Sequence, residues 1–435
     1  MAADAITELL AGTWPDPETG TPIGVPLQSI VIADSLAGIE ADLVGRLAMG
    51  RRFAVVSDSV THALLGERVE QAVASLGAVD PVRLPDNAHP DDATAAKLRA
   101  ATTEADALIA VGSGTINDLC KYVAAQDGKP YAVFGTAPSM NGYTSANAAI
   151  TVGGLKKSLP ARTPVGVFLD LGILAAAPPR MIRSGLGDSL CRPTAQADWL
   201  LSHLLRGTAY RTAPFALLAE DEAALFEAAE ALMMGDLAAM RVLARTLVLS
   251  GLGMVICGGS YPASQAEHLI SHYVEMMGDP GLPESFHGEQ IGVATLTSAR
   301  LQERVLSHDT PPVLRPTIVD ADDLIAHFGP ATGAACIREF QAKAMTAASV
   351  DAINERLSRG WPAIRQRIAA VRRSSVTLAQ TLAAAGAPAR PADLGWPAEF
   401  YRTALRRARQ IRSRYTFLDL AGDAGLLDPF AAGEG

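Results

Sequence analysis

Cysteine is scarce in this chain, which has only four, and none of them has a short spacing to another. They are Cys120, Cys191, Cys257 and Cys336. Because all four lie in apolar or helical surroundings, we expect reduced thiols and exclude both a disulfide framework and a zinc ribbon. The N-terminus also lacks a basic stretch followed by an apolar core, so no signal peptide is visible. These absences predict a cytoplasmic protein.

Long basic runs are absent too, and the formal net charge is −9. An acidic chain of this kind argues against a nucleic-acid surface. The densest basic patch, residues 406–409, is expected to be the solvated face of a terminal helix. The most apolar run, residues 247–257, is too short to span a bilayer and predicts a buried helix. We therefore expect neither a nucleic-acid partner nor a membrane partner.

What the chain does have is 435 residues, of which 49% are hydrophobic and 19% charged, as in an ordinary globular protein. Up to about residue 175, short β-branched runs alternate with helical segments, a pattern typical of a parallel sheet with helices on its faces. The expected helices in this part include residues 63–76 and 90–102. The expected strands are residues 29–33, 53–57, 81–84, 107–111, 131–134 and 165–169.

The strand pattern stops after Asp170, and the remainder is rich in alanine, leucine and arginine with helical periodicity. We expect two domains: an α/β domain over residues 1–175 with helices on both faces of a parallel sheet, and an all-α domain over residues 176–435. A ligand is expected in the cleft between them, beside the carboxyl ends of the strands.

A glycine-rich turn follows the fourth expected strand and opens an expected helix. It reads Gly112-Ser113-Gly114-Thr115. Glycines here let the backbone approach a pyrophosphate, and the start of the helix supplies free N–H donors. The sixth position of the dinucleotide-binding pattern is Asn117 instead of glycine, so the pattern alone is weak. The alternative interpretation is an ordinary tight turn that needs glycine for a positive φ.

Asp58 directly follows the expected strand at 53–57. A carboxylate at this place can accept a hydrogen bond from a ribose 2′-hydroxyl and repel a 2′-phosphate, which favours NAD(H) over NADP(H). The alternative interpretation is that Asp58 caps the helix that starts at Ser59.

Three of the eight histidines lie close together in the sequence. His268 and His272 are four residues apart, on one face of a helix if the segment is helical. His287 follows after a Gly/Pro break, with enough chain for a turn and a second helix to bring it back beside His268. Converging imidazoles with a carboxylate from elsewhere make a divalent-metal site. From the spacing alone, partly buried core histidines are the favoured alternative.

Several motifs occur in an order that resembles one known family. They are Gly112–Asp118, Thr136–Ser145, Ser184–Leu190, Glu267-His268, His287-Gly288-Glu289 and Arg412–Leu420. Over about residues 27–425 the chain resembles the sn-glycerol-1-phosphate dehydrogenases. This family belongs to the superfamily of iron-containing alcohol dehydrogenases, glycerol dehydrogenases and dehydroquinate synthases.

The resemblance implies a nucleotide-binding α/β domain, a helical metal-bearing domain and one divalent metal (Zn, Ni or Fe). The implied metal ligands are Asp188, His268 and His287. For Asp188, the alternative from the residues alone is a helix N-cap after Gly187. NAD(H) is expected as the preferred cofactor, with NADP(H) possible. The expected cofactor-binding residues are Asp58, Gly112, Ser113, Gly114, Thr115, Asp118, Thr136 and Ser139.

The chain departs from the family pattern at two places. Asn141 stands where relatives generally carry an aspartate, and an amide there cannot act as a base or an anion. Arg192-Pro193 stands where many relatives have a lysine and an aromatic residue, so Arg192 takes a charge role in this interpretation. Pro193 indicates an altered local backbone. His272 and Asn141 are the expected catalytic residues. The expected substrate-binding residues are Asn141, Lys156, Lys157, Arg192 and His272, and a solvated turn is the alternative for the two lysines.

The resemblance implies reduction of dihydroxyacetone phosphate to sn-glycerol 1-phosphate, through hydride transfer to a metal-polarised ketone. Asn141 keeps a second hypothesis open, a dehydrogenase of another polyol or phosphopolyol. A third is a cyclising lyase of the dehydroquinate synthase type, and a fourth is a nucleotide-binding protein without activity. We expect a small phosphorylated substrate as the ligand and a homo-oligomer as the assembly.

Overall fold

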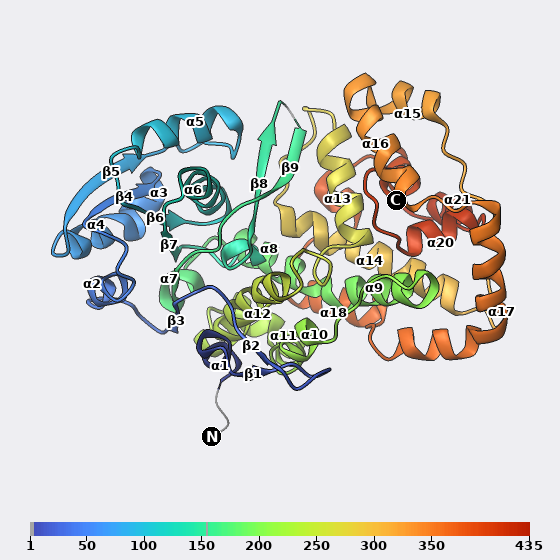
Figure 1. Ribbon diagram of the computed structural model, residues 1–435, viewed down its shortest axis with the longest axis horizontal. Coiled ribbons are helices and arrows are strands. Elements are labelled where there is room, and N and C mark those ends of the chain that lie inside the picture. Colours follow the sequence, from blue (N-terminus) through green and yellow to red (C-terminus); the bar gives the residue numbers. More distant parts are fainter. Residues whose placement is uncertain (1–3, 154) are drawn as a thin grey trace. The chain divides into compact units, whose positions relative to one another are not determined.

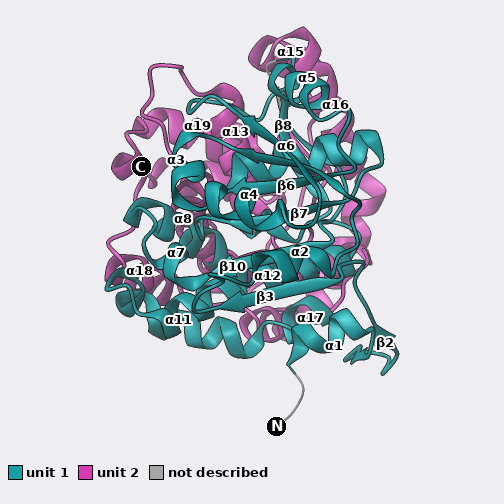
Figure 2. Ribbon diagram, turned by 90° about the vertical axis from the view of Figure 1, so that its left-hand side faces the viewer, with its two compact units in different colours: residues 1–189, 212–259 teal, residues 190–211, 260–435 magenta. Residues whose placement is uncertain are grey.

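The computed structural model describes residues 4–153 and 155–435. The chain forms two compact units, one of residues 1–189 with 212–259 and one of residues 190–211 with 260–435 (Figure 2). These ranges differ from the expected division at residue 175, because the long helix α12 (Leu237–Ile256) packs on the first unit. Arg241 of this helix donates to the carbonyl of Ile32 in the sheet at 2.9 Å.

Six parallel strands form the sheet of the first unit, in the order β3-β10-β7-β6-β4-β5. All six expected strands are present, within three residues of the expected bounds. They are β3 (Ser29–Ala33), β4 (Arg52–Ser57), β5 (Ala78–Arg83), β6 (Ala107–Gly112), β7 (Tyr131–Gly135) and β10 (Gly166–Asp170). Three of the four interior strands, β6, β7 and β10, are buried at every position, as expected where helices cover both faces of a parallel sheet.

Helices pack around this sheet and around α12, and Figure 1 shows them in colours from blue to yellow-green. Those of the first unit are α1 (Ala5–Ala11), α2 (Glu40–Gly45), α3 (Ser59–Thr61), the π-helix η1 (His62–Gly66), α4 (Glu67–Val73), α5 (Asp92–Ala101), α6 (Gly114–Asp127), η2 (Asn141–Tyr143), α7 (Leu171–Ala175), α8 (Pro179–Leu190, whose last residue falls in the second unit), α10 (Ala213–Ala216), α11 (Ala219–Met233) and α12. Side chains of α2 and α4, such as Val44 and Val69, join the core with Val55 and Phe134 of the sheet.

Two antiparallel hairpins were not expected from the sequence. One pairs β1 (Trp14–Pro15) with β2 (Pro22–Ile23), and the other pairs β8 (Asn147–Val152) with β9 (Leu155–Pro160). In the second hairpin Val152 lies opposite Leu155, and Gly153 at the turn has a φ of 59°. Two-residue hairpin turns require such positive φ values, which glycine adopts without strain.

Helix α12 contains the apolar run that was expected to be a buried helix. It is the one helix in the described chain that is long and apolar enough to cross a membrane. However, 72% of its apolar window is buried inside the fold. Its apolar side chains, among them Leu243, Leu247 and Leu249, are buried, and the helix packs against α7, α10, α11 and β3 of the first unit.

The second unit is helical throughout its described secondary structure. It contains α9 (Arg192–Arg206), α13 (Ala266–Met277), α14 (His287–Leu306), α15 (Ala321–Phe328), α16 (Pro330–Lys343), α17 (Ala347–Ala369), α18 (Ser375–Ala384), η3 (Pro391–Leu394), α19 (Ala398–Arg407), η4 (Ala408–Gln410), α20 (Phe417–Asp423) and α21 (Leu427–Ala432). Trp361 and Tyr401 are among the large side chains of its core. Residues 406–409 are not entirely a solvated face, because Arg409 is 8% exposed and pairs with Asp419 and Asp423.

Candidate functional site

The glycine-rich turn has the strand–turn–helix form that the sequence predicts. Strand β6 ends at Gly112, Ser113 precedes the helix, and α6 begins at Gly114. Neither glycine has a positive φ, so the tight-turn alternative is wrong. A Cβ on Gly112 would lie 2.6 Å from Ile116 Cδ1, whereas a Cβ on Gly114 would meet only Met140 Cγ, at 3.7 Å. Gly112 is thus needed for close packing, and the backbone at Gly114 stays open to a ligand.

Asp118 lies on α6, where it connects the helix to the β8–β9 hairpin. Its Oδ2 accepts the N–H of Ala149 at 3.0 Å, and its Oδ1 lies 3.4 Å from Lys121 Nζ. Lys121 is fully buried and also donates to Ser145 Oγ at 3.1 Å and the carbonyl of Asn147 at 3.0 Å. Burial lowers the pKa of Lys121. Sequence reasoning missed this lysine, since nothing in a helical pattern marks a buried ammonium group.

Thr136 and Ser139 follow strand β7, at its carboxyl end. Thr136 is buried, and its N–H donates to the carbonyl of Gly112 at 3.2 Å. The carbonyl of Ser139 accepts the Ser184 hydroxyl at 3.1 Å. The structure therefore places both residues in the first unit, with Thr136 directly beside the turn after β6.

Asp58 is the N-cap of α3, as its second interpretation holds. Its Oδ1 accepts the N–H of Thr61 at 2.7 Å and the Thr61 hydroxyl at 2.9 Å. Both bonds end on Oδ1, so capping does not use Oδ2. A ribose contact through Oδ2 remains a prediction.

Asp188 lies in the last turn of α8 and is 1% exposed, so it is not the helix N-cap of the alternative interpretation. Its Oδ2 accepts the main-chain N–H of Asn141 at 2.9 Å. The Asn141 side-chain amide donates to Ser250 Oγ at 3.3 Å. The main chain of Asn141 therefore holds Asp188 in place, and this contact does not depend on the Asn141 side chain.

Close packing of α8 also fixes Asp188. A Cβ on Gly185 would lie 1.6 Å from the carbonyl oxygen of Pro138, which is main chain and cannot move aside. We predict that Gly185→Ala lowers the free energy of unfolding by several kcal/mol, as overpacking against backbone does. Urea unfolding measures this, with Gly114→Ala as the control because its Cβ meets nothing closer than 3.7 Å. Equal midpoints for the two variants would contradict this packing.

Two helices of the second unit carry the three histidines. His268 and His272 lie one turn apart on α13, and His287 is the first residue of α14. The helical spacing expected for the first pair is present. The ring centroid of His268 lies 5.2 Å from that of His287 and 5.9 Å from that of His272. The capping bond from the N–H of Phe286 to Glu289 Oε2, at 2.7 Å, fixes the start of α14.

Glu267 orients the His268 ring, a role that sequence reasoning did not assign. Its Oε1 lies 2.9 Å from His268 Nδ1 and also accepts the N–H of Gln265 at 2.7 Å. Glu267 is fully buried. Because a carboxylate only accepts hydrogen bonds, His268 Nδ1 carries the proton, and Nε2 keeps its lone pair for a metal.

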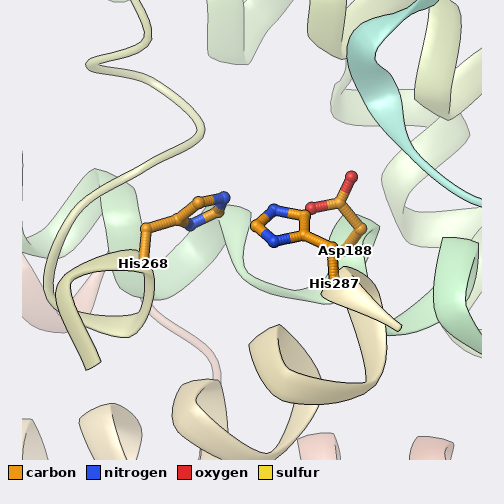
Figure 3. A group of neighbouring side chains, drawn as sticks. All are labelled: Asp188, His268 and His287. Carbon is orange, nitrogen blue, oxygen red and sulfur yellow. The ribbon is translucent and has the colours of Figure 1, made fainter. Parts of the chain in front are cut away.

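One carboxylate oxygen of Asp188 and one ring nitrogen each of His268 and His287 lie within 4.8 Å of one another. Figure 3 shows the three side chains turned toward the same place. Cys191, Glu267 and His268 form a second group of the same compactness. In that group Glu267 Oε1 is already bound to His268 Nδ1 and to the N–H of Gln265, and the Cys191 thiol donates to the carbonyl of Ala263 at 3.6 Å. The first group is therefore the better candidate.

Asp198 is a second buried carboxylate near this end of α13. It accepts the N–H of Ala266 at 3.1 Å and the N–H of Phe417 at 2.8 Å, the first residues of α13 and α20. Burial, together with the charge of Glu267, raises the pKa of Asp198 to about 8. This residue was also missed, because its partners lie far away in the sequence.

The expected substrate-binding residues lie in different surroundings. Lys157 is exposed on β9, and the Lys156 side chain lies outside the described residues. Arg192 is buried as the first residue of α9. His272 is partly buried beside His268. Of these, the structure brings His272 to the histidine cluster.

Comparison with known proteins gives the family. The family model for iron-containing alcohol dehydrogenases matches residues 31–178. A glycerol-1-phosphate dehydrogenase (NAD(P)+) of Bacillus subtilis (strain 168) is 31% identical over 407 residues, which cover 92% of each chain. The chain belongs to the glycerol-1-phosphate dehydrogenase family. A relative of the same name from Bacillus licheniformis is 28% identical and covers 94% of this chain and 92% of its own.

Solved structures of other enzymes share the fold. A glycerol dehydrogenase from Schizosaccharomyces pombe has a TM-score of 0.60 at 16% identity and covers 93% of this chain and 90% of its own. A maleylacetate reductase from Rhizobium sp. strain MTP-10005 has a TM-score of 0.59 at 17% identity and covers 93% of this chain and 95% of its own. The expected fold class, a parallel α/β sheet followed by a helical part, is confirmed.

Proposed function

We propose that this glycerol-1-phosphate dehydrogenase family member reduces dihydroxyacetone phosphate to sn-glycerol 1-phosphate, with NAD(P)H and one divalent metal. The observation that carries the proposal is the convergence of Asp188, His268 and His287 within 4.8 Å. The family relationship over nearly the whole chain supports the same activity.

Asp188, His268 and His287 are the side chains that would hold the metal. One carboxylate and two imidazoles are a donor set for Zn²⁺, Ni²⁺ or Fe²⁺. Bound there, a divalent cation supplies Lewis-acid polarisation of the ketone and stabilises negative charge on its oxygen. Glu267 keeps His268 in the tautomer that presents Nε2, and the Asn141 N–H fixes one oxygen of Asp188.

His272 is the proposed source of the proton that the reduced oxygen takes up. It lies one turn from His268 on α13, and its ring centroid is 6.4 Å from that of His287. A neighbouring histidine of this kind can hold and donate a proton near neutral pH. Asn141 cannot serve as a base, so we assign it to positioning Asp188 and the substrate.

The start of α6 is the proposed binding place for the cofactor pyrophosphate. Gly114 leaves the backbone open there, and the free N–H groups of a helix start favour an anion. Ser113, Thr115, Thr136 and Ser139 complete the proposed set in the first unit. Asp118 acts from within α6 by fixing its contact with β8.

Asp58 predicts a preference for NAD(H), because a 2′-phosphate would meet its charge. Asp58→Ser keeps a helix-capping hydroxyl but removes that charge. We expect the preference in kcat/KM for NADH over NADPH to fall about tenfold, or roughly 1.4 kcal/mol. Steady-state rates with each cofactor measure the ratio. An unsubstituted enzyme that already prefers NADPH would show that Asp58 does not lie at the ribose.

The proposed function is tested by following nicotinamide absorbance while the purified protein is given dihydroxyacetone phosphate. We expect NAD(P)H oxidation that stops with a chelator and returns when a divalent metal is restored. Chiral analysis of the product should give sn-glycerol 1-phosphate. Activity that is unchanged after complete metal removal, or no activity with any ketone phosphate, would contradict the proposal.

A further inference from the structure

The segment between η4 and α20 carries two arginines for which the proposed function has no role. It reads Ile411-Arg412-Ser413-Arg414-Tyr415-Thr416 and was part of the family resemblance. A partly exposed glutamate and a buried lysine hold its backbone in place. The N–H of Ser413 donates to Glu339 Oε2 at 2.8 Å, and Lys343 Nζ donates to the carbonyl of Arg414 at 2.6 Å.

Arg414 is held by the loop that leads into α13. Its guanidinium donates to the carbonyl of Ser264 and to Ser260 Oγ, the latter at 2.8 Å. It also lies over the ring of Tyr261, 4.7 Å from the centroid. These contacts use two of the five N–H donors of the guanidinium, so it is fixed in direction and still has donors to offer.

Arg412 is a partly buried cation that makes no hydrogen bond or ion pair with any described residue. Burial lowers its pKa, and the carboxylate that opposes this effect, Glu339, already accepts the N–H of Ser413. Burial and the charge of Arg412 also lower the pKa of Arg414 to about 10. Arg412 and Arg414 stand two residues apart on one loop, and an anion bound beside them would be stabilised by both charges.

The position of Arg412 and Arg414 in the second unit suits binding of a substrate whose ketone lies at the candidate metal site. Ser264, which Arg414 contacts, lies four residues before His268, and η4 packs against α13. Arg414 is also close enough to Glu267 for that carboxylate to act on its pKa. Arg414 thus lies at the start of α13, the end of the helix that carries His268.

We propose that Arg412 and Arg414 bind the phosphate dianion of the substrate. This inference rests on the proposed function and adds the residues that select a phosphorylated ketone. The planar guanidinium fork matches phosphate oxygens in a bidentate way, and Arg414 is already fixed for it. Arg412 has its full set of donors available for the same anion.

The test compares Arg412→Gln and Arg412→Lys with Arg359→Gln in the metal-loaded enzyme. Arg359 is a suitable control because it is 79% exposed and pairs only with Glu355 on its own helix. We expect Arg412→Gln to raise KM for dihydroxyacetone phosphate roughly 10- to 100-fold with a smaller change in kcat. Arg412→Lys should show a smaller rise in KM, because lysine keeps the positive charge but lacks the planar guanidinium group. Arg359→Gln should behave as the parent enzyme.

Calorimetric titration with inorganic phosphate provides a readout that needs no activity. Phosphate binding that is lost in Arg412→Gln but kept in Arg359→Gln supports the anion site, even if dihydroxyacetone phosphate is not a substrate. Normal reduction of dihydroxyacetone phosphate with an unchanged KM in Arg412→Gln would overturn the inference and leave the proposed function intact. If Arg412→Gln raises KM for NADPH alone, the arginines bind a phosphate of the cofactor. That result would also overturn the inference.

Discussion

Replacing His268 with alanine is expected to remove the bound metal and to lower kcat/KM by about a thousandfold or more. Loss of a residue that only orients a metal ligand typically costs 10- to 100-fold, so loss of the ligand itself should cost more. His268 is central because Glu267 fixes its tautomer and because its ring lies 5.2 Å from that of His287. Elemental analysis and steady-state kinetics on the same preparation measure both effects.

His308→Ala is the control for this variant, since His308 lies in the same unit and is exposed. Circular dichroism should show both variants folded, because the substitution removes one polar side chain and leaves the apolar core cluster of the second unit unchanged. A His268→Ala protein that keeps one metal per chain would remove His268 from the ligand set.

Dihydroxyacetone phosphate is expected to be reduced with a kcat/KM about 10⁴ times that of dihydroxyacetone. A site built to bond a phosphate leaves its cations unpaired when the phosphate is missing, and such sites discriminate strongly. Arg412 and Arg414 are the cations of this argument, and Lys157, Arg192 and His272 are further candidates for phosphate contact. Parallel rates with the two ketones measure the ratio.

Equal rates with the two ketones would place the protein among enzymes for unphosphorylated polyols. Inactivity with both would direct attention to Asn141, where the resemblance led us to expect an aspartate. Its amide bonds Ser250 Oγ at 3.3 Å, and an amide lacks the charge and the basicity of a carboxylate. A different polyol or phosphopolyol would then be the substrate to seek.

The parallel sheet could be predicted from the sequence because fully buried strands are continuous runs of apolar residues. Residues 107–111 and 131–134 are such runs, and each is buried at every position. The β8–β9 hairpin could not be predicted in this way. Buried and partly exposed positions mix along β8, and its partner β9 carries Lys156 and Lys157. The boundary between the two units could not be predicted either, because α12 packs on the sheet through contacts between residues that are distant in the sequence.

In the candidate site, too, the sequence could predict features that depend on neighbouring residues but not those that depend on contacts between distant residues. The spacing of His268 and His272 is a local signal, and the helix that it requires is present. Glu267 adjoins His268 in the sequence, but its role depends on burial and on the direction of its side chain. Lys121 and Asp198 have partners that only the fold brings near, so no pattern in the sequence reveals them.

The most direct test of the central claim is anomalous X-ray diffraction from a crystal of the zinc-loaded protein at the zinc absorption edge. We predict one anomalous peak bonded to a carboxylate oxygen of Asp188 and to a ring nitrogen each of His268 and His287. A peak held instead by Cys191, Glu267 and His268, or no peak at Asp188, would contradict the assignment.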